Sequence, residues 1–169
     1  AEEIYEVIPG TRGDSVLLEE YYPHLATLEA NAAMGREFWS RVLTVKQAVN
    51  KCLEDARNAK IVRNSLAAEV TLYADDSLRE TLTQLGEELR FVLLTSEVHL
   101  ASLEDAGSAQ AEASELEGLK VAVVSSPHAK CERCWHHRAD VGTHAADPNL
   151  CGRCLSNLPE GPGETRHYA

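Results

Sequence analysis

The sequence predicts an α+β protein made of three consecutive parts. The first observation behind this prediction is an amphipathic helical pattern between residues 31 and 62. The second is a series of short β-rich runs around one further helical segment, between residues 66 and 127. The third is a C-terminal segment with four of the five cysteines in two Cys-x-x-Cys pairs. We therefore expect parts that comprise residues 1–65, 66–127 and 128–169.

The first part is expected to be the end of a helical structure. Residues 2–8 suit a short helix that stops before Pro9-Gly10, and a long surface connection follows. Within residues 31–62, apolar side chains recur at intervals of four and three and so share one stripe. The stripe consists of Phe38, Val42, Val45, Val49, Cys52 and Ala56. It should pack against other helices, of which the chain supplies few. The chain also begins without methionine, so we expect a fragment of a longer bundle.

The second part is expected to be a small α+β unit. Its β-rich runs predict strands over residues 69–73, 91–94, 98–100 and 119–124. The two middle strands should be joined by a tight turn. The stretch Asp75-Asp76-Ser77 supplies an N-cap for a helix over residues 76–89, whose buried face is marked by leucines. The acidic stretch 104–117 has low hydrophobicity and is expected to be a mobile loop.

Composition and charge restrict the class of protein. With 44% hydrophobic and 25% charged residues, the chain has the make-up of a soluble globular protein. No apolar run approaches the length of a membrane span, and the N-terminus lacks the features of a secretory signal, so a cytoplasmic protein with reduced thiols is expected. The net charge of −11 is unevenly spread. Residues 31–65 carry seven basic and three acidic side chains, and local charge determines contact with phosphate.

The cysteine segment has the spacing of a structural zinc site. Cys131-x₂-Cys134 is followed after sixteen residues by Cys151-x₂-Cys154. Two thiolates three positions apart on a tight turn can occupy two corners of a tetrahedron, and the second turn supplies the other two. Four thiolates around one Zn²⁺ leave no open position for water, so the ion would fold the segment rather than catalyse. The alternative is four inert or disulfide-linked cysteines.

The residues beside these cysteines admit two interpretations. A basic cluster either offsets the −2 charge of a zinc–tetrathiolate centre or contacts phosphates and bases; it comprises Lys130, Arg133, Arg138 and Arg153. Trp135 offers a face on which a base could stack, or it forms the small core of the first cysteine turn. Three histidines could replace a cysteine as ligand but are not needed: His136, His137 and His144. Cys52 lies on the helical stripe and is expected to be a packing residue.

Three motifs in this region resemble the C-terminal end of bacterial isoleucyl-tRNA synthetases. They are C-x-R-C-W-H at residues 131–136, C-G-R-C-x-S-N at residues 151–157, and G-E-x-R-x-x-A at residues 163–169. Upstream, the segment EFWSRVLTVKQAVNKCLEDARNAK resembles the last long helix of that family's anticodon-binding domain. SLAAEVTLYA and ELRFVLLTSEV resemble the strands that follow. The resemblance covers nearly the whole chain.

The resemblance implies a piece of a cytoplasmic, monomeric class I synthetase that joins isoleucine to its tRNA with ATP and Mg²⁺. The family's ATP-handling signatures H-I-G-H and K-M-S-K-S are missing from this sequence, so no catalytic residue is expected here. Residues 1–65 would end the anticodon-binding helical domain, 66–127 would form a junction, and 128–169 would form the zinc finger. By the same resemblance, Arg133 and Trp135 are the candidates for contact with the tRNA anticodon stem-loop, and the rest of the synthetase chain is the other partner.

Two alternatives come from other classes of protein. A formamidopyrimidine-type DNA glycosylase has a C-terminal zinc finger of similar spacing, but that family uses an N-terminal proline as nucleophile, whereas this chain begins Ala-Glu-Glu. A zinc-clamped protein-interaction module, with an acidic surface that binds a basic partner, would also suit the net charge.

Overall fold

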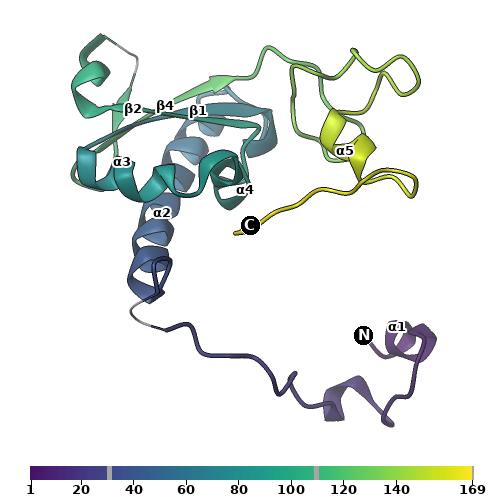
Figure 1. Cartoon of the computed structure of the whole chain (residues 1–169). Helices are drawn as coiled ribbons and strands as arrows, with labels where there is room; N and C mark the ends of the chain where they lie inside the picture. Colours follow the sequence, from purple (N-terminus) through teal and green to yellow (C-terminus); the bar gives the residue numbers. More distant parts are fainter. Residues whose placement is uncertain (30–31, 109–110, 169) are drawn as a thin grey trace. The chain divides into compact units, whose positions relative to one another are not determined.

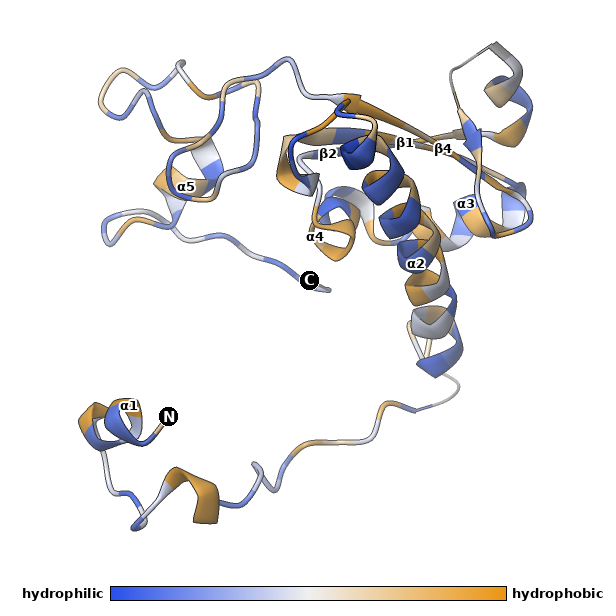
Figure 2. Cartoon of the chain, turned by 180° about the vertical axis from the view of Figure 1, so that it is seen from behind, coloured by the Kyte–Doolittle hydropathy of each residue, from blue (hydrophilic) through white to orange (hydrophobic). Residues whose placement is uncertain are grey.

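The computed structural model describes residues 1–29, 32–108 and 111–168, and it contains two compact units, Ala1–Arg36 and Glu37–Ala169. In the first unit, helix α1 (Glu2–Val7) ends before Pro9, as the sequence predicts. A 3-10 turn, η1 (Val16–Leu18), follows and is drawn in orange in Figure 2 because its side chains are hydrophobic. Neither α1 nor η1 contains a buried residue. This unit is held by polar contacts, such as the Ser15 hydroxyl donating to Glu2 at 2.6 Å.

The second unit is built on a four-stranded mixed sheet with the order β2-β1-β4-β3 (Figure 1). Its strands are β1 (Ala68–Ala74), β2 (Glu97–Ser102), β3 (Glu112–Ala113) and β4 (Leu119–Ser125). β1 runs parallel to β2 and antiparallel to β4, and β3 pairs antiparallel with β4. The sequence analysis placed domain boundaries near residues 65 and 127, and both positions lie inside this unit. The division into separate domains at these positions stays a prediction.

One face of the sheet forms the core of the second unit. Along β1, every second residue from Ala68 to Ala74 is buried, and the residues between them are half-buried. Val70 lies opposite Val98 of β2 and Val123 of β4, so the apolar side chains of the three strands share that face. Both views of the molecule show helices α2 (Arg36–Asn58), α3 (Asp76–Thr83) and α4 (Leu89–Leu93) on one side of the sheet (Figures 1 and 2).

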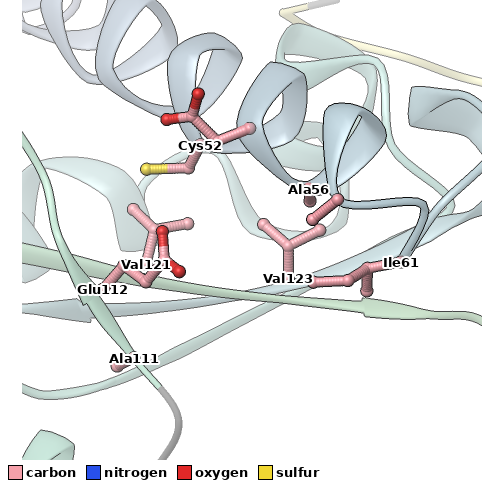
Figure 3. A pocket seen from close by; sticks show the side chains of 9 residues that line it. Cys52, Ala56, Ile61, Ala111, Glu112, Val121 and Val123 are labelled. Carbon is pink, nitrogen blue, oxygen red and sulfur yellow. The ribbon is translucent and has the colours of Figure 1, made fainter.

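Part of the apolar stripe of α2 faces this sheet, and its packing against further helices stays a prediction. Figure 3 shows Cys52 and Ala56 of α2 facing Val121 and Val123 of β4. Cys52 is thus buried, as a packing residue should be. The helix provides the stripe because its apolar side chains follow the 3.6-residue period, and β4 provides the complementary surface because it alternates with a period of two.

Two secondary-structure predictions in this unit are wrong. The helix expected over residues 76–89 stops at Thr83, and a 3-10 turn, η3 (Gly86–Glu88), leads into α4. The segment 91–94, expected to be a strand, instead forms the last residues of α4 and its C-cap, Leu94. Four consecutive apolar residues look alike in a buried strand and in a buried helix, and here tertiary packing selects the helix.

The acidic stretch 104–117 is partly structured. A 3-10 segment, η4 (Leu103–Ser108), is followed by β3, and residues 109–110 of the predicted loop lie outside the described residues. In the part of the chain that the structure describes, we find no helix that is both long and apolar enough to cross a membrane.

Candidate metal centre

Four sulfur atoms meet in the C-terminal segment. The Sγ atoms of Cys131, Cys134, Cys151 and Cys154 all lie within 4.8 Å of one another. The Sγ atoms of Cys134 and Cys151 are 3.8 Å apart. In a tetrahedral zinc site with Zn–S bonds of about 2.3 Å, the sulfur atoms are about 3.8 Å apart. The spacing therefore fits a Zn²⁺ ion better than disulfides, and all five cysteines of the chain are free thiols.

The first pair of ligands is held by a tight backbone turn. The backbone N–H of Trp135 donates to the carbonyl of Cys131 at 2.9 Å, and the N–H of Cys131 donates to the carbonyl of His136, also at 2.9 Å. Trp135 has φ of 67°, a left-handed conformation that is uncommon for a bulky residue. The turn thus brings the two sulfur atoms together and turns the Trp135 side chain outward.

The second pair lies at the start of helix α5 (Gly152–Ser156), with Cys151 as its N-cap residue. The N–H of Cys151 points at the sulfur of Cys131 at 3.4 Å, so a backbone dipole favours negative charge on that sulfur. The N–H of Gly152 donates to Asp140 at 2.6 Å. A Cβ at Gly152 would lie 3.0 Å from this carboxylate, so the approach of backbone to Asp140 favours glycine.

The electrostatics of the thiols also suit a metal ion. Although burial raises it, the backbone N–H groups of Cys134, Cys151 and Arg133 lower the pKa of Cys131 to about 6. Burial raises the pKa of Cys154 and, less strongly, that of Cys151. Cys131 is therefore ready to ionise, while Cys151 and Cys154 need a cation beside them to lose their protons.

The neighbouring histidines lie outside the group of sulfur atoms. His136 is buried, and its Nδ1 lies 3.2 Å from the carbonyl of Cys134. Burial and then the nearby Arg90 and Arg153 lower the pKa of His136 to about 4, so its imidazole is neutral at physiological pH. Among the residues that the structure describes, the metal-compatible group contains the four cysteines and no histidine.

The two candidate RNA-contact residues lie in the same turn but have different surroundings. Trp135 is 61% exposed, and the Nζ of Lys130 lies 5.1 Å from its ring centroid. Trp135 is thus no core residue. The Nη1 of Arg133 donates to the carbonyls of Cys154 at 2.8 Å and Asn157 at 3.0 Å, near the end of α5. Arg133 therefore has a structural role in addition to any contact with RNA.

The structure adds an aromatic residue that the sequence analysis assigned to a strand. Phe91 of α4 lies beside the cysteine segment, and three guanidinium groups face its ring: Arg90 at 4.0 Å, Arg166 at 4.5 Å and Arg153 at 5.3 Å. His136 meets the same ring edge-on, with centroids 6.0 Å apart. No local motif marks Phe91, because its partners come from α5 and the C-terminal tail.

Further contacts fix the cysteine segment to the sheet. The N–H of His137 donates to the Ser96 hydroxyl at 2.6 Å, and Nη1 of Arg138 donates to the Ser96 carbonyl at 3.0 Å. Arg138 also forms an ion pair with Glu97 at the start of β2. Arg138 thus helps to hold the cysteine segment on the sheet, a role that neither interpretation of the basic cluster included.

Both the cysteine segment and the whole chain are similar to known proteins. Residues 130–157 match the zinc finger found in FPG and IleRS. Over all 169 residues, the chain is 99% identical to an isoleucine–tRNA ligase from Chromohalobacter salexigens, 57% identical to one from Pseudomonas paraeruginosa, and 54% identical to one from Marinomonas sp.. It spans about 18% of the length of each of these relatives. The chain therefore matches the C-terminal 18% of isoleucine–tRNA ligases over its whole length and contains their four-cysteine zinc finger.

Proposed function

We propose that the chain is the anticodon-side tRNA-binding region of an isoleucine–tRNA ligase. The observation that carries this proposal is the exposed Trp135, held outward by the cysteine turn beside Lys130 in a chain that matches isoleucine–tRNA ligases over its whole length. Activation of isoleucine with ATP and Mg²⁺, and its transfer to tRNA, then belong to the rest of that enzyme, and this chain contributes no catalytic residue.

One structural Zn²⁺ is bound by Cys131, Cys134, Cys151 and Cys154 in this proposal. The fit of the sulfur spacing and the ionised state favoured at Cys131 support it. The ion would supply the link between two turns that share few apolar side chains, and four thiolates leave it no position for a substrate. Its role is to keep Trp135 in a fixed orientation.

Trp135 and Arg133 would contact unpaired bases of the anticodon stem-loop. Single-stranded loop bases are unstacked and can lie against an aromatic ring or a guanidinium plane. Lys130 beside the ring adds positive charge that attracts the phosphate backbone. Arg133 uses Nη1 for its two carbonyl bonds, and its residue is exposed, so its remaining donors can face a ligand.

Residues 1–65 would form the end of the anticodon-binding helical domain, 66–127 a junction, and 128–169 the zinc finger with its tail. The rest of the synthetase chain would then cover exposed apolar side chains of the first unit, among them Ile4, Val7 and Leu17. A monomeric, cytoplasmic enzyme with no membrane partner is the setting that this proposal implies.

The proposal predicts that Trp135→Gly separates RNA binding from stability. Glycine tolerates the left-handed backbone, so the variant should be at least as stable as the wild type. It should bind an isoleucine tRNA anticodon stem-loop roughly 5- to 150-fold more weakly, because stacking on an aromatic ring contributes about 1–3 kcal/mol per base. Fluorescence anisotropy gives the affinity, and thermal unfolding gives the stability.

A matched control is available in Leu94, which also has a left-handed backbone (φ of 58°) and an exposed apolar side chain. Leu94→Gly should likewise be at least as stable as the wild type, and it should leave RNA affinity unchanged. Equal RNA affinity of Trp135→Gly and the wild type would overturn the stacking role. The matched zinc finger is also found in FPG, which corresponds to the DNA-glycosylase alternative. A lesion-containing DNA duplex is therefore a suitable competitor for the RNA. Preference for that duplex would favour the glycosylase alternative.

A further inference from the structure

A cavity of about 350 Å³ lies between the C-terminal half of α2 and strands β3 and β4 (Figure 3). None of the residues that line it belongs to the zinc finger. Its apolar lining is formed by small and β-branched side chains: Ala56, Ala59, Ile61, Ala111, Val121 and Val123. Ile61 is 50% exposed, so the apolar surface continues to the outside of the molecule. A volume of about 300–1,000 Å³ and a largely apolar lining are usual for ligand sites.

Two carboxylates give this cavity its charge. Asp55 of α2 and Glu112 of β3 line it, whereas the described residues of its lining include no lysine or arginine. Neither carboxylate forms an ion pair or a side-chain hydrogen bond within the part of the chain that the structure describes. Lys51, one turn before Asp55, pairs with Glu115 instead. The cavity therefore presents two negative charges that no positive side chain of its lining balances.

The charges of both carboxylates reach the interior of the cavity. Cys52 lines the cavity and is 8% exposed, and Figure 3 shows its side chain pointing from α2 toward Val121 and Glu112. Burial raises the pKa of the Cys52 thiol, and the charges of Glu112 and then Asp55 raise it further, against a weaker opposite effect of Lys51. Charges that act on a buried thiol also act on a ligand in contact with that thiol.

The chemistry of the lining argues against two classes of ligand and favours a third. Both carboxylates would repel an anion. Among the described residues, the group compact enough for a metal ion consists of the zinc-finger cysteines and includes neither Asp55 nor Glu112. A primary ammonium group on an alkyl stem suits the cavity, because its three N–H groups can reach separate carboxylates while the stem contacts the apolar lining.

We propose that this cavity receives a primary ammonium group on an alkyl stem, supplied by a lysine side chain from the rest of the longer enzyme. The inference rests on the proposal that the chain is one region of an isoleucine–tRNA ligase, and it depends on neither zinc nor tRNA binding. The chain spans about 18% of the length of such a relative, so most of the polypeptide that could supply the lysine lies outside it.

A free alkylamine has the same chemistry as the lysine side chain, and concentration decides between them. The site binds weakly, because ion pairs of exposed carboxylates contribute little, and both Asp55 and Glu112 are exposed. A lysine in the same polypeptide can reach an effective concentration in roughly the millimolar range, which is enough to fill a weak site. The tethered side chain is therefore the favoured occupant.

Two small molecules test the chemistry on the 169-residue chain. Nα-acetyl-lysine methylamide and Nα-acetyl-norleucine methylamide differ only in the ammonium group. Titration followed by the NMR signals of the Cys52 and Val121 amides should show roughly 2- to 30-fold tighter binding of the lysine derivative, as expected for two exposed ion pairs. Equal binding of the two molecules, or no binding of the lysine derivative, would overturn the ammonium site.

Carbodiimide cross-linking of the full-length enzyme that contains this chain tests the source of the ammonium group. The reagent joins an amine to a carboxylate with which it is in contact. Mass spectrometry should find Asp55 or Glu112 linked to a lysine outside these 169 residues. The ion pair of Lys51 with Glu115 is an internal positive control, since it should be cross-linked in the same sample. Recovery of the control link alone would overturn the docking of a lysine from the rest of the enzyme.

Matched variants make both measurements specific. The double variant Asp55→Asn, Glu112→Gln keeps the shape of two exposed side chains and removes their charge. It should lose the cross-link and bind the lysine derivative no more tightly than the norleucine derivative. Asp76→Asn removes an exposed carboxylate of α3 and should change neither result. Both variants should keep wild-type affinity for the anticodon stem-loop, so failure of this inference is distinguishable from failure of the tRNA-binding proposal.

Discussion

Trp135 and Arg133 stand two positions apart in one turn, yet the structure uses them differently. Trp135 is exposed and has a strained backbone, whereas Arg133 spans two carbonyls near the end of α5. Backbone strain at an exposed aromatic residue persists only when the surrounding bonds enforce it, and here the cysteine turn does so. Replacing Arg133 should therefore affect both folding and RNA binding, while replacing Trp135 should affect RNA binding alone.

At this scale the cluster of four cysteines was predictable from sequence, and the surroundings of Arg90 were not. Each Cys-x-x-Cys pair is formed within one turn, so its spacing alone determines how close the two sulfur atoms lie. Arg90 acquires its environment only when α4, α5 and the C-terminal tail come together around Phe91. A contact between segments that are distant in sequence leaves no periodic pattern to recognise.

We expect Gly161→Ala to destabilise the end of the chain. A Cβ at Gly161 would collide with the carbonyl oxygen of Ser156 and would lie 2.8 Å from the carbonyl oxygen of Leu155. Because these neighbours are backbone atoms that cannot rotate away, the substitution should lower the free energy of unfolding by about 1–3 kcal/mol. Chemical denaturation measures this change.

Gly107→Ala is the matched control, since nothing lies within 4 Å of a Cβ built at Gly107 and its φ is not in the left-handed region. Its free energy of unfolding should stay within about 0.5 kcal/mol of the wild type. If both substitutions had the same small effect, the turn after α5 would be more adaptable than its contacts indicate.

At the scale of elements, periodicity predicted most of the second unit, and the failure at residues 91–94 has an identifiable cause. The N-cap expected from residues 75–77 is confirmed and lies at Asp75, whose carboxylate accepts from the N–H of Leu78 at 2.8 Å. The strands around Val70 and Val121 are confirmed as well. The error at residues 91–94 arose because a run of four apolar residues has no period of its own. Leu94 then adopts a left-handed conformation that ends α4, a feature more typical of glycine.

Asp75→Ala should weaken the start of α3. The substitution removes the side-chain acceptor for Leu78, and the loss of such a cap typically costs about 0.5–2 kcal/mol. Asp76→Ala provides the comparison, because Asp76 is exposed and its ion pair is with Arg79 on the same helix. Urea denaturation should show a clear loss for Asp75→Ala and a change of less than about 0.5 kcal/mol for Asp76→Ala.

At the scale of the whole molecule, the second unit combines two kinds of stabilisation. The sheet and its helices have an apolar core, which includes Leu72, Leu82 and Leu89. The zinc finger has a much smaller one, in which the four cysteines are accompanied by Val141 and Leu150. We therefore expect a segment with so few apolar side chains to depend on a metal ion for its folding, and the sheet to fold without one.

Chelation of zinc is therefore expected to unfold residues 128–158 and to spare the sheet and its helices. Hydrogen exchange should show rapid loss of protection at amides such as that of Leu155, while amides of β1 keep theirs. Elemental analysis should find one zinc ion per chain beforehand. Simultaneous loss of protection in β1 would contradict this division of stability.

The central position of β1 has a consequence for synthesis on the ribosome. β1 can pair with β2 after α3 and α4 have formed, but its other neighbour comes much later, since Ala68 lies opposite Ser125 of β4. At roughly 5–20 residues per second, translation leaves one edge of β1 open for several seconds. An open edge is a template for pairing with another nascent chain. Slower elongation between β2 and β4 should therefore raise the fraction of aggregated product, even though the finished protein has no such edge at β1.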